Sequence, residues 1–168
     1  RGGAPLLVSA RVGVKLFMDG ALGSRGAALV RPYSDAPGDG LLVTPIDDLR
    51  ALLARARARG IQAATHAIGD RGNRLVLDAY RDAFADNPAA LREARWRIDH
   101  AQVIAPEDIP RFAQTGVIAS MQPSHAISDL HFAPARLGDA RLPGAYAWHS
   151  LLRSGAIIAG GSDAPVEK

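Results

Sequence analysis

Short apolar runs alternate with longer amphipathic segments along this chain. Five runs have the length and composition of buried strands, and they cover residues 12–17, 61–66, 96–100, 117–121 and 157–161. Between them, apolar residues recur at helical spacing and predict four main helices, over residues 44–60, 70–84, 106–116 and 145–154. This alternation predicts an α/β fold with five parallel strands and helices packed outside, as in open doubly wound sheets and (β/α)₈ barrels.

Punctuating residues set the expected ends of these elements. Thr44 is the predicted N-cap of the first helix, and Gly60 is its predicted end. The dipeptide Asn87-Pro88 is expected to break the second helix. Two stretches, 20–43 and 122–143, have no clear period and follow strands. They are therefore predicted to be long loops at the carboxyl end of the sheet, where α/β folds place their sites.

Composition narrows the class of protein. The 168 residues fit one domain, and a hydrophobic content of 48% supports a sizeable core. The absence of Cys excludes disulfides and thiolate sites. No run of 18 apolar residues predicts a membrane span, and a net charge of +3 without a basic stripe gives no indication of nucleic-acid binding. No charged-then-apolar leader opens the sequence, so we expect a cytoplasmic protein.

One lysine stands inside an apolar run. Lys15 is one of only two lysines among 20 basic residues, and the period of two in its strand places it opposite Val14 and Leu16. If those apolar side chains meet the helices, Lys15 points into the barrel or sheet crevice. A buried ammonium needs a partner or a chemical change, whereas a lysine at a strand end can also simply reach water.

Polar residues end three of the predicted strands. His66 and His100 follow successive strands, and Asp163 follows the last. Imidazole and carboxylate are ligands suited to Zn²⁺ and similar divalent cations, and carboxyl ends of parallel strands converge at one end of a barrel. Each histidine alone is equally compatible with a structural role. His125 lies in the second long loop, as either a substrate contact or a surface residue.

The glycines between His66 and Arg74 also allow a phosphate-loop interpretation. Neither the Walker pattern nor G-x-G-x-x-G is present, however. We favour a tight turn at Gly69 with Asp70 as the helix N-cap, and keep an open α/β phosphate-binding protein as an alternative.

Several strings resemble the metal-dependent amidohydrolase superfamily, in particular amidohydrolase family 3 and its N-substituted formamide deformylase-like branch. They are Val-Lys-Leu-Phe-Met-Asp-Gly-Ala-Leu-Gly-Ser-Arg at 14–25, Pro-Tyr-Ser-Asp at 32–35, Thr-His-Ala-Ile-Gly-Asp-Arg at 65–71, Asp-His-Ala-Gln at 99–102, Gln-Pro-Ser-His at 122–125 and Gly-Ser-Asp-Ala-Pro-Val at 161–166. The strings occur in the same order as in that branch and cover nearly the whole chain.

The resemblance implies a (β/α)₈ barrel with one or two divalent metals, usually zinc. Lys15 would be the strand-four lysine, carbamylated and bridging the metals, with His66 and His100 as further ligands. Asp163 would be a ligand and would orient or deprotonate the attacking water. The implied substrate class is amides, formamides or cyclic amides, and the implied activity is hydrolysis of their C–N bonds. Arg25, Tyr33 and His125 are candidate substrate contacts.

The family's strand-one His-x-His pair does not occur in this sequence. Counted backwards, the five predicted strands correspond to strands four to eight, and a barrel usually needs ~250 residues. We therefore expect residues 1–168 to form a single partial barrel domain without strands one to three and the final helix, inactive alone, which associates with itself or with the missing half. A non-catalytic truncated barrel or assembly module is the alternative.

Overall fold

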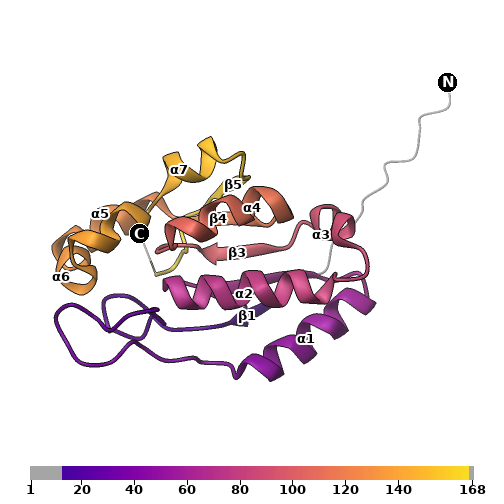
Figure 1. Cartoon of the computed structure of the whole chain (residues 1–168), viewed down its shortest axis with the longest axis horizontal. Helices are drawn as coiled ribbons and strands as arrows, with labels where there is room; N and C mark the ends of the chain where they lie inside the picture. The colour runs from indigo at the N-terminus through magenta and orange to yellow at the C-terminus, as the bar shows by residue number, and fades with distance from the viewer. Residues whose placement is uncertain (1–12, 167–168) are drawn as a thin grey trace.

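A computed structural model describes residues 13–166 and contains one parallel five-stranded sheet with the strand order β1-β2-β3-β4-β5. Each strand pairs in parallel with the next one along the chain (Figure 1). The strands are β1 (Gly13–Phe17), β2 (Gln62–Ala67), β3 (Arg97–His100), β4 (Ile118–Met121) and β5 (Ile158–Gly160). The α/β fold with five parallel strands is thus confirmed, and sequential order is that of part of a (β/α)₈ barrel.

The four predicted main helices are present, the third and fourth shorter than expected. Three further α-helices occur among the described residues. The helices are α1 (Ile46–Ala58), α2 (Asp70–Ala83), α3 (Pro88–Ala94), α4 (Ile109–Thr115), α5 (Pro123–Ser128), α6 (Ala133–Leu137) and α7 (Trp148–Arg153), with 3₁₀ turns η1 (Pro106–Asp108), η2 (Asp129–His131) and η3 (Asp139–Gly144).

One prediction about irregular segments was confirmed and one was wrong. The helix α2 ends at Ala83, before Asn87-Pro88, as predicted, and Pro88 is in addition the first residue of α3, where its missing N–H is not needed. The stretch 122–143 was predicted to be a loop but contains α5, α6 and two 3₁₀ turns. These helices span five or six residues, too few to show a helical period in the sequence.

Two predicted helix caps were also wrong. Pro45, not Thr44, is the N-cap of α1, and the Thr44 hydroxyl instead donates to the Phe17 carbonyl at 2.6 Å. Gly69, not Asp70, is the N-cap of α2. The carboxylate of Asp70 accepts the backbone N–H of Val30 at 2.8 Å and that of Arg71, in its own helix, at 2.9 Å, so it ties the loop before α1 to the start of α2.

The main core lies between the sheet and the helices that cover one of its faces (Figure 1). Strand residues that point to that face are buried, as with Leu16, Ala63 and Ile98. Phe17, on the opposite face, is 48% exposed. The buried side chains from α1, α2 and α4 that complete this core include Leu49, Leu53, Val76, Leu77, Tyr80 and Phe112. The opposite face corresponds to the inside of a barrel.

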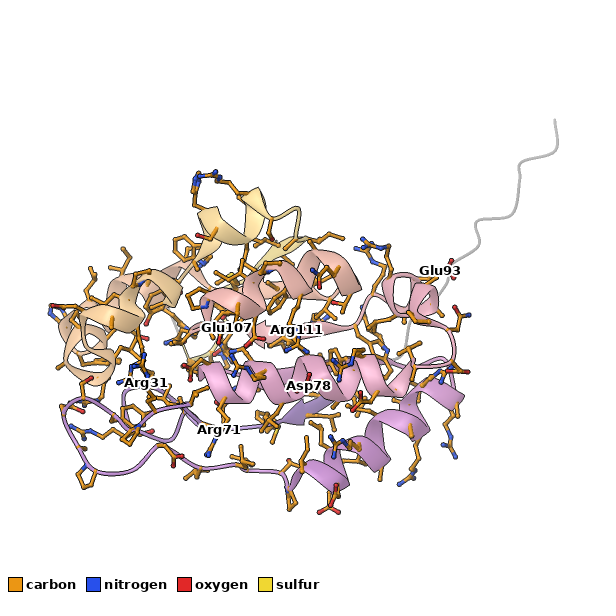
Figure 2. All side chains as sticks on the ribbon, in the orientation of Figure 1. Arg31, Arg71, Asp78, Glu93, Glu107 and Arg111 are labelled. Atoms are coloured by element: carbon orange, nitrogen blue, oxygen red, sulfur yellow. The ribbon has the colours of Figure 1, made fainter. Side chains whose placement is uncertain are left out.

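Charged side chains connect α2 to the η1–α4 segment outside the sheet (Figure 2). The guanidinium of Arg111 contacts Asp78 at 2.5 Å and Asp108 at 2.8 Å. Arg74 contacts Asp108 at 2.7 Å and Glu107 at 2.6 Å. Asp108 thus accepts from two arginines, and this network fixes α2 relative to α4 at the surface.

A second core cluster lies at the carboxyl ends of the strands. The segment 18–45 has no helix there, but its residues Leu22, Leu29 and Tyr33 are buried against Ala133 and Leu137 of α6. This segment and α5–α6 lie side by side at one end of the molecule, on the left in Figure 1. Within residues 13–166 no helix has the length and apolar character to cross a bilayer.

Candidate metal centre

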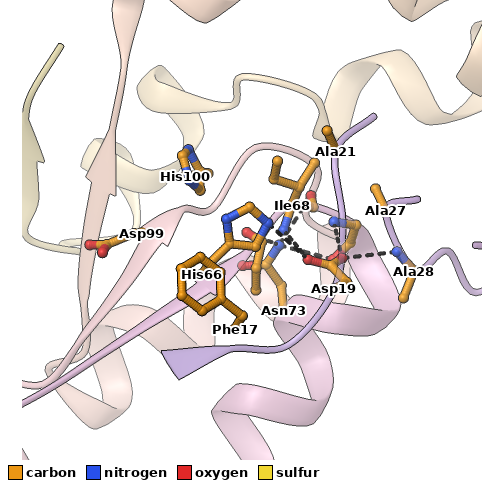
Figure 3. A network of polar contacts seen from close by, with 12 residues as sticks. Phe17, Asp19, Ala21, Ala27, Ala28, His66, Ile68, Asn73, Asp99 and His100 are labelled. Carbon is orange, nitrogen blue, oxygen red and sulfur yellow. Dashed lines mark hydrogen bonds and ion pairs between the residues drawn. The ribbon is translucent and has the colours of Figure 1, made fainter. Parts of the chain in front are cut away.

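His66 and His100 lie together at the carboxyl ends of β2 and β3. Their ring centroids are 4.5 Å apart and the rings meet edge to face at 69° (Figure 3). The ring of Phe17 packs 5.6 Å from that of His66 and closes one side of the pair. His100 has a φ of 75°, which turns its side chain at the point where β3 ends.

His125 and Asp163 complete this group. The ring of His125, in α5, stacks on that of His100 with centroids 5.5 Å apart and an angle of 13°. Donor atoms of His100, His125 and Asp163 all lie within 4.8 Å of one another, and the Nε2 atom of His125 is 3.8 Å from Oδ2 of Asp163. His125, which the sequence suggested as a substrate contact, therefore lies among the potential cation ligands.

Lys15 lies near the same end of the sheet and is paired with Asp99. Its ammonium contacts the carboxylate of Asp99, which also accepts a hydrogen bond from Arg97 Nε at 2.9 Å. The side chain of Lys15 is 41% exposed. Paired and partly in water, the ammonium needs no covalent change to be tolerated in this conformation.

The electrostatic environment keeps the two central imidazoles neutral. Burial, followed by the nearby His100 and Lys15, lowers the pKa of His66 to about 4, although Asp163 opposes the shift. Burial also lowers the pKa of His100, again against the charge of Asp163. His66 and His100 thus each lie within electrostatic range of both Lys15 and Asp163. Neutral imidazole is the form that binds a metal, so this environment favours cation binding at neutral pH.

Asp19, which no sequence pattern singled out as a site residue, lies next to His66. It is 1% exposed, and its carboxylate accepts backbone N–H groups of Ala28 at 2.9 Å, Ile68 at 2.9 Å and Gly69 at 2.8 Å (Figure 3). Burial raises the pKa of Asp19 to about 6 in spite of these donors. Asp19 therefore ties the segment after β1 to the β2–α2 turn. The only sequence signal was its place in the Met18-Asp19-Gly20 string after a strand.

The start of α2 leaves no place for a phosphate. The backbone N–H groups of Arg71 and Gly72 donate to the carbonyl of Ala28, at 3.1 and 3.2 Å, and that of Gly69 donates to Asp19. A phosphate loop needs such groups to be available to the ligand. The phosphate-binding alternative is therefore not supported by the structure.

Arg25 and Tyr33, the other predicted substrate contacts, have protein partners. Arg25 forms a two-pronged contact with Asp35, at 3.1 and 2.9 Å. Tyr33 is 4% exposed, and its hydroxyl donates to the carbonyl of Ala27 at 2.8 Å. In this conformation both side chains hold the 18–45 segment, and their contact with a substrate stays a prediction.

The donor set fits a divalent cation of the zinc type. The donor atoms of two imidazoles and one carboxylate converge, the ring of His66 lies beside them, and the buried Nε2 atom of His66 has no hydrogen-bond partner. Nitrogen and oxygen donors in this mixture are typical of zinc and related metals. His66, His100, His125 and Asp163 are the residues that would hold the cation, with Lys15 beside them.

Comparisons with known proteins show the family of this chain. Residues 9–168 match the amidohydrolase family, and the chain belongs to that family. It is 41% identical over 156 residues to the protein LONG AFTER FAR-RED 3 of Arabidopsis thaliana, and 39% identical over 155 residues to YtcJ of Bacillus subtilis. These matches cover 92% of this chain but only 26% and 28% of the two relatives.

Two solved structures also match nearly the whole of this chain with a small part of their own length. An uncharacterized metal-dependent hydrolase from Pyrococcus furiosus is 35% identical and superposes with a TM-score of 0.82, over 94% of this chain and 31% of that one. Its counterpart from Pyrococcus horikoshii is 34% identical with a TM-score of 0.81, over 94% of this chain and 30% of that one. The chain thus spans about a third or less of the length of the relatives it matches.

Proposed function

We propose that this chain supplies part of the active site of a metal-dependent hydrolase that cleaves C–N bonds of amide- or formamide-type small molecules. The observation that carries the proposal is the convergence of His100, His125 and Asp163 donor atoms, with His66 and Lys15 adjacent, at the carboxyl ends of parallel strands. Family membership and the similarity to metal-dependent hydrolases support it. The cation we propose is zinc.

The chemistry divides between the cation and the side chains. A bound divalent cation lowers the pKa of water and polarises a carbonyl. Asp163 has a side chain that is 35% exposed and faces His125. It accepts the proton of the attacking water and delivers it to the leaving nitrogen, so that the carbonyl carbon gains an oxygen as the C–N bond breaks.

Lys15 has a second proposed state. Reaction of its neutral amine with CO₂ forms a carbamate and releases one proton. The lysine then carries an anionic oxygen ligand in place of a cationic ammonium. Asp99 would keep Arg97 as its partner after this change, because Arg97 Nε already donates to it at 2.9 Å. The loss of the ammonium would therefore not leave Asp99 as an unpaired buried charge.

The inner face of the sheet is proposed to be covered by another part of the protein or by a second copy of the chain. β1 and β5 are the edge strands of the described sheet, and Phe17 is half exposed on its inner face. Matched relatives are more than three times as long, which is consistent with further barrel strands. Native mass spectrometry of the isolated 168 residues should show self-association; a stable monomer would contradict this proposal.

The activity is tested on the full-length protein. Removal of metal with a chelator should abolish hydrolysis of a panel of N-formyl and amide compounds, and added Zn²⁺ should restore it. Asp163→Asn should lower kcat by about 10²–10⁴-fold. Asp86→Asn, an exposed aspartate paired with Arg57, is the matched control and should keep the wild-type rate.

Two outcomes would overturn the proposal. One is undiminished turnover in the chelated protein or in the Asp163 variant. The other is a protein that binds Zn²⁺ and hydrolyses none of the panel, which would favour the non-catalytic assembly module.

A further inference from the structure

We propose that Asp129 is a positioning residue that fixes the short helix α5 and, with it, His125. Gln102 and Tyr146 hold the carboxylate of Asp129 by hydrogen bonds. His125 then stays stacked on His100, with its donor atom in reach of a cation. This inference rests on the proposed function for its cation, but the contacts that carry it belong to the chain alone.

The segment that carries His125 has no apolar anchor of its own. Within α5 and η2, residues 123–131, no residue is buried. Ile127 and Leu130, which could have supplied such an anchor, are 69% and 62% exposed. A helix of six residues is also too short to hold its shape through its own hydrogen bonds. The position of α5 therefore has to come from polar contacts with the rest of the chain.

Asp129 receives two hydrogen bonds from outside this segment. Its Oδ2 atom accepts from the amide nitrogen of Gln102 at 2.6 Å and from the hydroxyl of Tyr146 at 2.5 Å. The same amide nitrogen donates to the hydroxyl oxygen of Tyr146 at 2.9 Å. Because a carboxylate only accepts, the phenol must give its hydrogen to Asp129, and the two N–H groups of the amide divide between the two oxygen atoms. The three side chains thus close a ring of hydrogen bonds whose directions are all determined.

The two donors are fixed to the same stretch of backbone as His100. Gln102 is buried two residues after His100, and its carbonyl accepts the backbone N–H of Tyr146 at 2.7 Å. Tyr146 has a φ of 50°, a left-handed conformation that a non-glycine residue keeps only where its surroundings hold it. On the other side, the backbone N–H of Asp129 donates to the carbonyl of His125. The helix turn from His125 to Asp129 is therefore attached at both ends to the 100–102 stretch, and a shift of Asp129 would displace His125 relative to His100.

The test measures local order and metal affinity in the full-length protein. Hydrogen exchange of the metal-free protein, followed by mass spectrometry, reports the order of residues 123–131. Competition with a chromophoric chelator gives the Zn²⁺ affinity. Asp129→Ala should raise exchange in 123–131 and weaken Zn²⁺ binding about 10-fold, at the lower end of what the loss of an outer partner costs a metal site. Exchange elsewhere should stay the same, because Gln102 and Tyr146 remain hydrogen-bonded to each other.

Two further variants separate positioning from a general loss of stability. Asp129→Asn keeps one side-chain oxygen, which can accept from both donors because both bonds end on the same atom, Oδ2. It should retain the order of α5 and a Zn²⁺ affinity within a few-fold of wild type. Tyr80→Phe is the matched control, since its buried hydroxyl donates to the Arg97 carbonyl at 2.8 Å and has no contact with α5. It should lose stability without a local rise in exchange at 123–131 or a change in Zn²⁺ affinity.

Three results would overturn the inference: unchanged exchange at 123–131 in Asp129→Ala, equal losses in Asp129→Ala and Asp129→Asn, or a uniform rise in exchange along the chain in both Asp129→Ala and Tyr80→Phe. If Asp129→Ala does not fold, Tyr146→Phe, which removes one of the two donors, should give a smaller rise at the same place. A wild-type protein that binds no Zn²⁺ refutes the proposed function. The exchange measured without metal would still confirm or refute the fixing of α5 by Asp129.

Discussion

Lys15 on β1 contacts Asp99 on β3 across the intervening strand β2. The β2 residue in register with Lys15 is Ala64, whose small side chain leaves room for the contact. Burial raises the pKa of Asp99, but Lys15 and Arg97 outweigh it, and the net effect is a lowered pKa. Asp99 is therefore charged at neutral pH and holds Lys15 beside the histidines.

Substitution of Lys15 separates a catalytic role from a structural one. Lys15→Met should abolish hydrolysis by the full-length protein, because neither an ammonium nor a carbamate can form. The free energy of unfolding should fall by no more than about 1 kcal/mol, since the lysine is 41% exposed and Asp99 retains Arg97. Steady-state kinetics and urea unfolding measure the two effects. Retained turnover would contradict the role of Lys15.

Asn73 is predicted to be a major structural residue of the β2–α2 turn. It is fully buried, and its amide nitrogen lies 3.0–3.3 Å from the carbonyls of Ala67, Ile68, Gly69 and Val103. Asn73→Ala removes the side-chain donor from these carbonyls, although those of Ala67, Ile68 and Gly69 keep a backbone N–H donor. It should lower the free energy of unfolding by about 1–3 kcal/mol. Asn87→Ala, at a helix start without a side-chain cap bond, should change it by less than about 0.5 kcal/mol. Equal effects in urea titrations would refute this assignment.

Replacement of Gly72 by Ala should destabilise the protein, although the same replacement normally stabilises a helix. Ala is better than Gly inside helices by about 1 kcal/mol. Here, however, the added Cβ would lie 2.5 Å from Oδ2 of Asp19, which three backbone donors hold in place. Gly72→Ala should therefore destabilise the protein by about 1–3 kcal/mol in thermal or chemical unfolding. Gly160→Ala, where nothing lies within 4 Å of the new atom, is the control. A more stable Gly72 variant would show that Asp19 is not fixed.

The stability of the metal-free protein should depend on pH through His66. Its pKa is about 4 in the folded protein against an ordinary value of 6.5, so the folded state binds the proton less readily. The neutral imidazole makes its full contribution to the free energy of unfolding above pH 6.5, and this contribution is lost as the pH falls from 6.5 through about 4. The difference between the two pKa values corresponds to roughly 3 kcal/mol of unfolding free energy.

The titration of Asp19 changes the stability with pH in the opposite direction to that of His66. A comparison of the wild type with His66→Gln is therefore needed to isolate the contribution of His66. The pKa of Asp19 is raised from 3.8 to about 6, so its contribution falls as the pH rises through that range. Relative to His66→Gln, the wild type should lose about 2 kcal/mol of unfolding free energy between pH 7.5 and pH 5. Urea titrations at both pH values measure the difference. Parallel pH profiles would show that the imidazole titrates normally.

The strands were predictable because each is a short apolar run whose residues are buried on the helix-facing side. The structure places them within one or two residues of the predicted ends, as for β5 at Ile158–Gly160 against 157–161. The helices α3, α5 and α6 were not predictable by periodicity, because five to seven residues complete no more than two turns. Asn87-Pro88 indicated the break after α2, and Pro88 and Pro123 also begin new helices.

The candidate site was partly predictable for a related reason. Lys15, His66 and His100 stand out because polar side chains interrupt or end apolar strands. Asp19 and Asp129 do not stand out, because their importance comes from partners far away in the chain: Asp19 accepts from Ile68 and Gly69, and Asp129 accepts from Gln102 and Tyr146. Spacing in a single sequence carries no trace of such pairings.

The anchoring of the 18–45 segment by Asp19 has a consequence for how this protein can diversify. The base of the segment is hydrogen-bonded to Asp19, the buried carboxylate that also faces His66, so substitutions at this base would disturb the donor cluster. Its tip is held by its own bonds, from Leu29 to Asp39 at 2.7 Å and from Tyr33 to Gly38 at 2.9 Å. Exposed positions between these contacts, such as Arg31 and Pro32, can therefore change in sequence without disturbing Asp19 or the donor cluster.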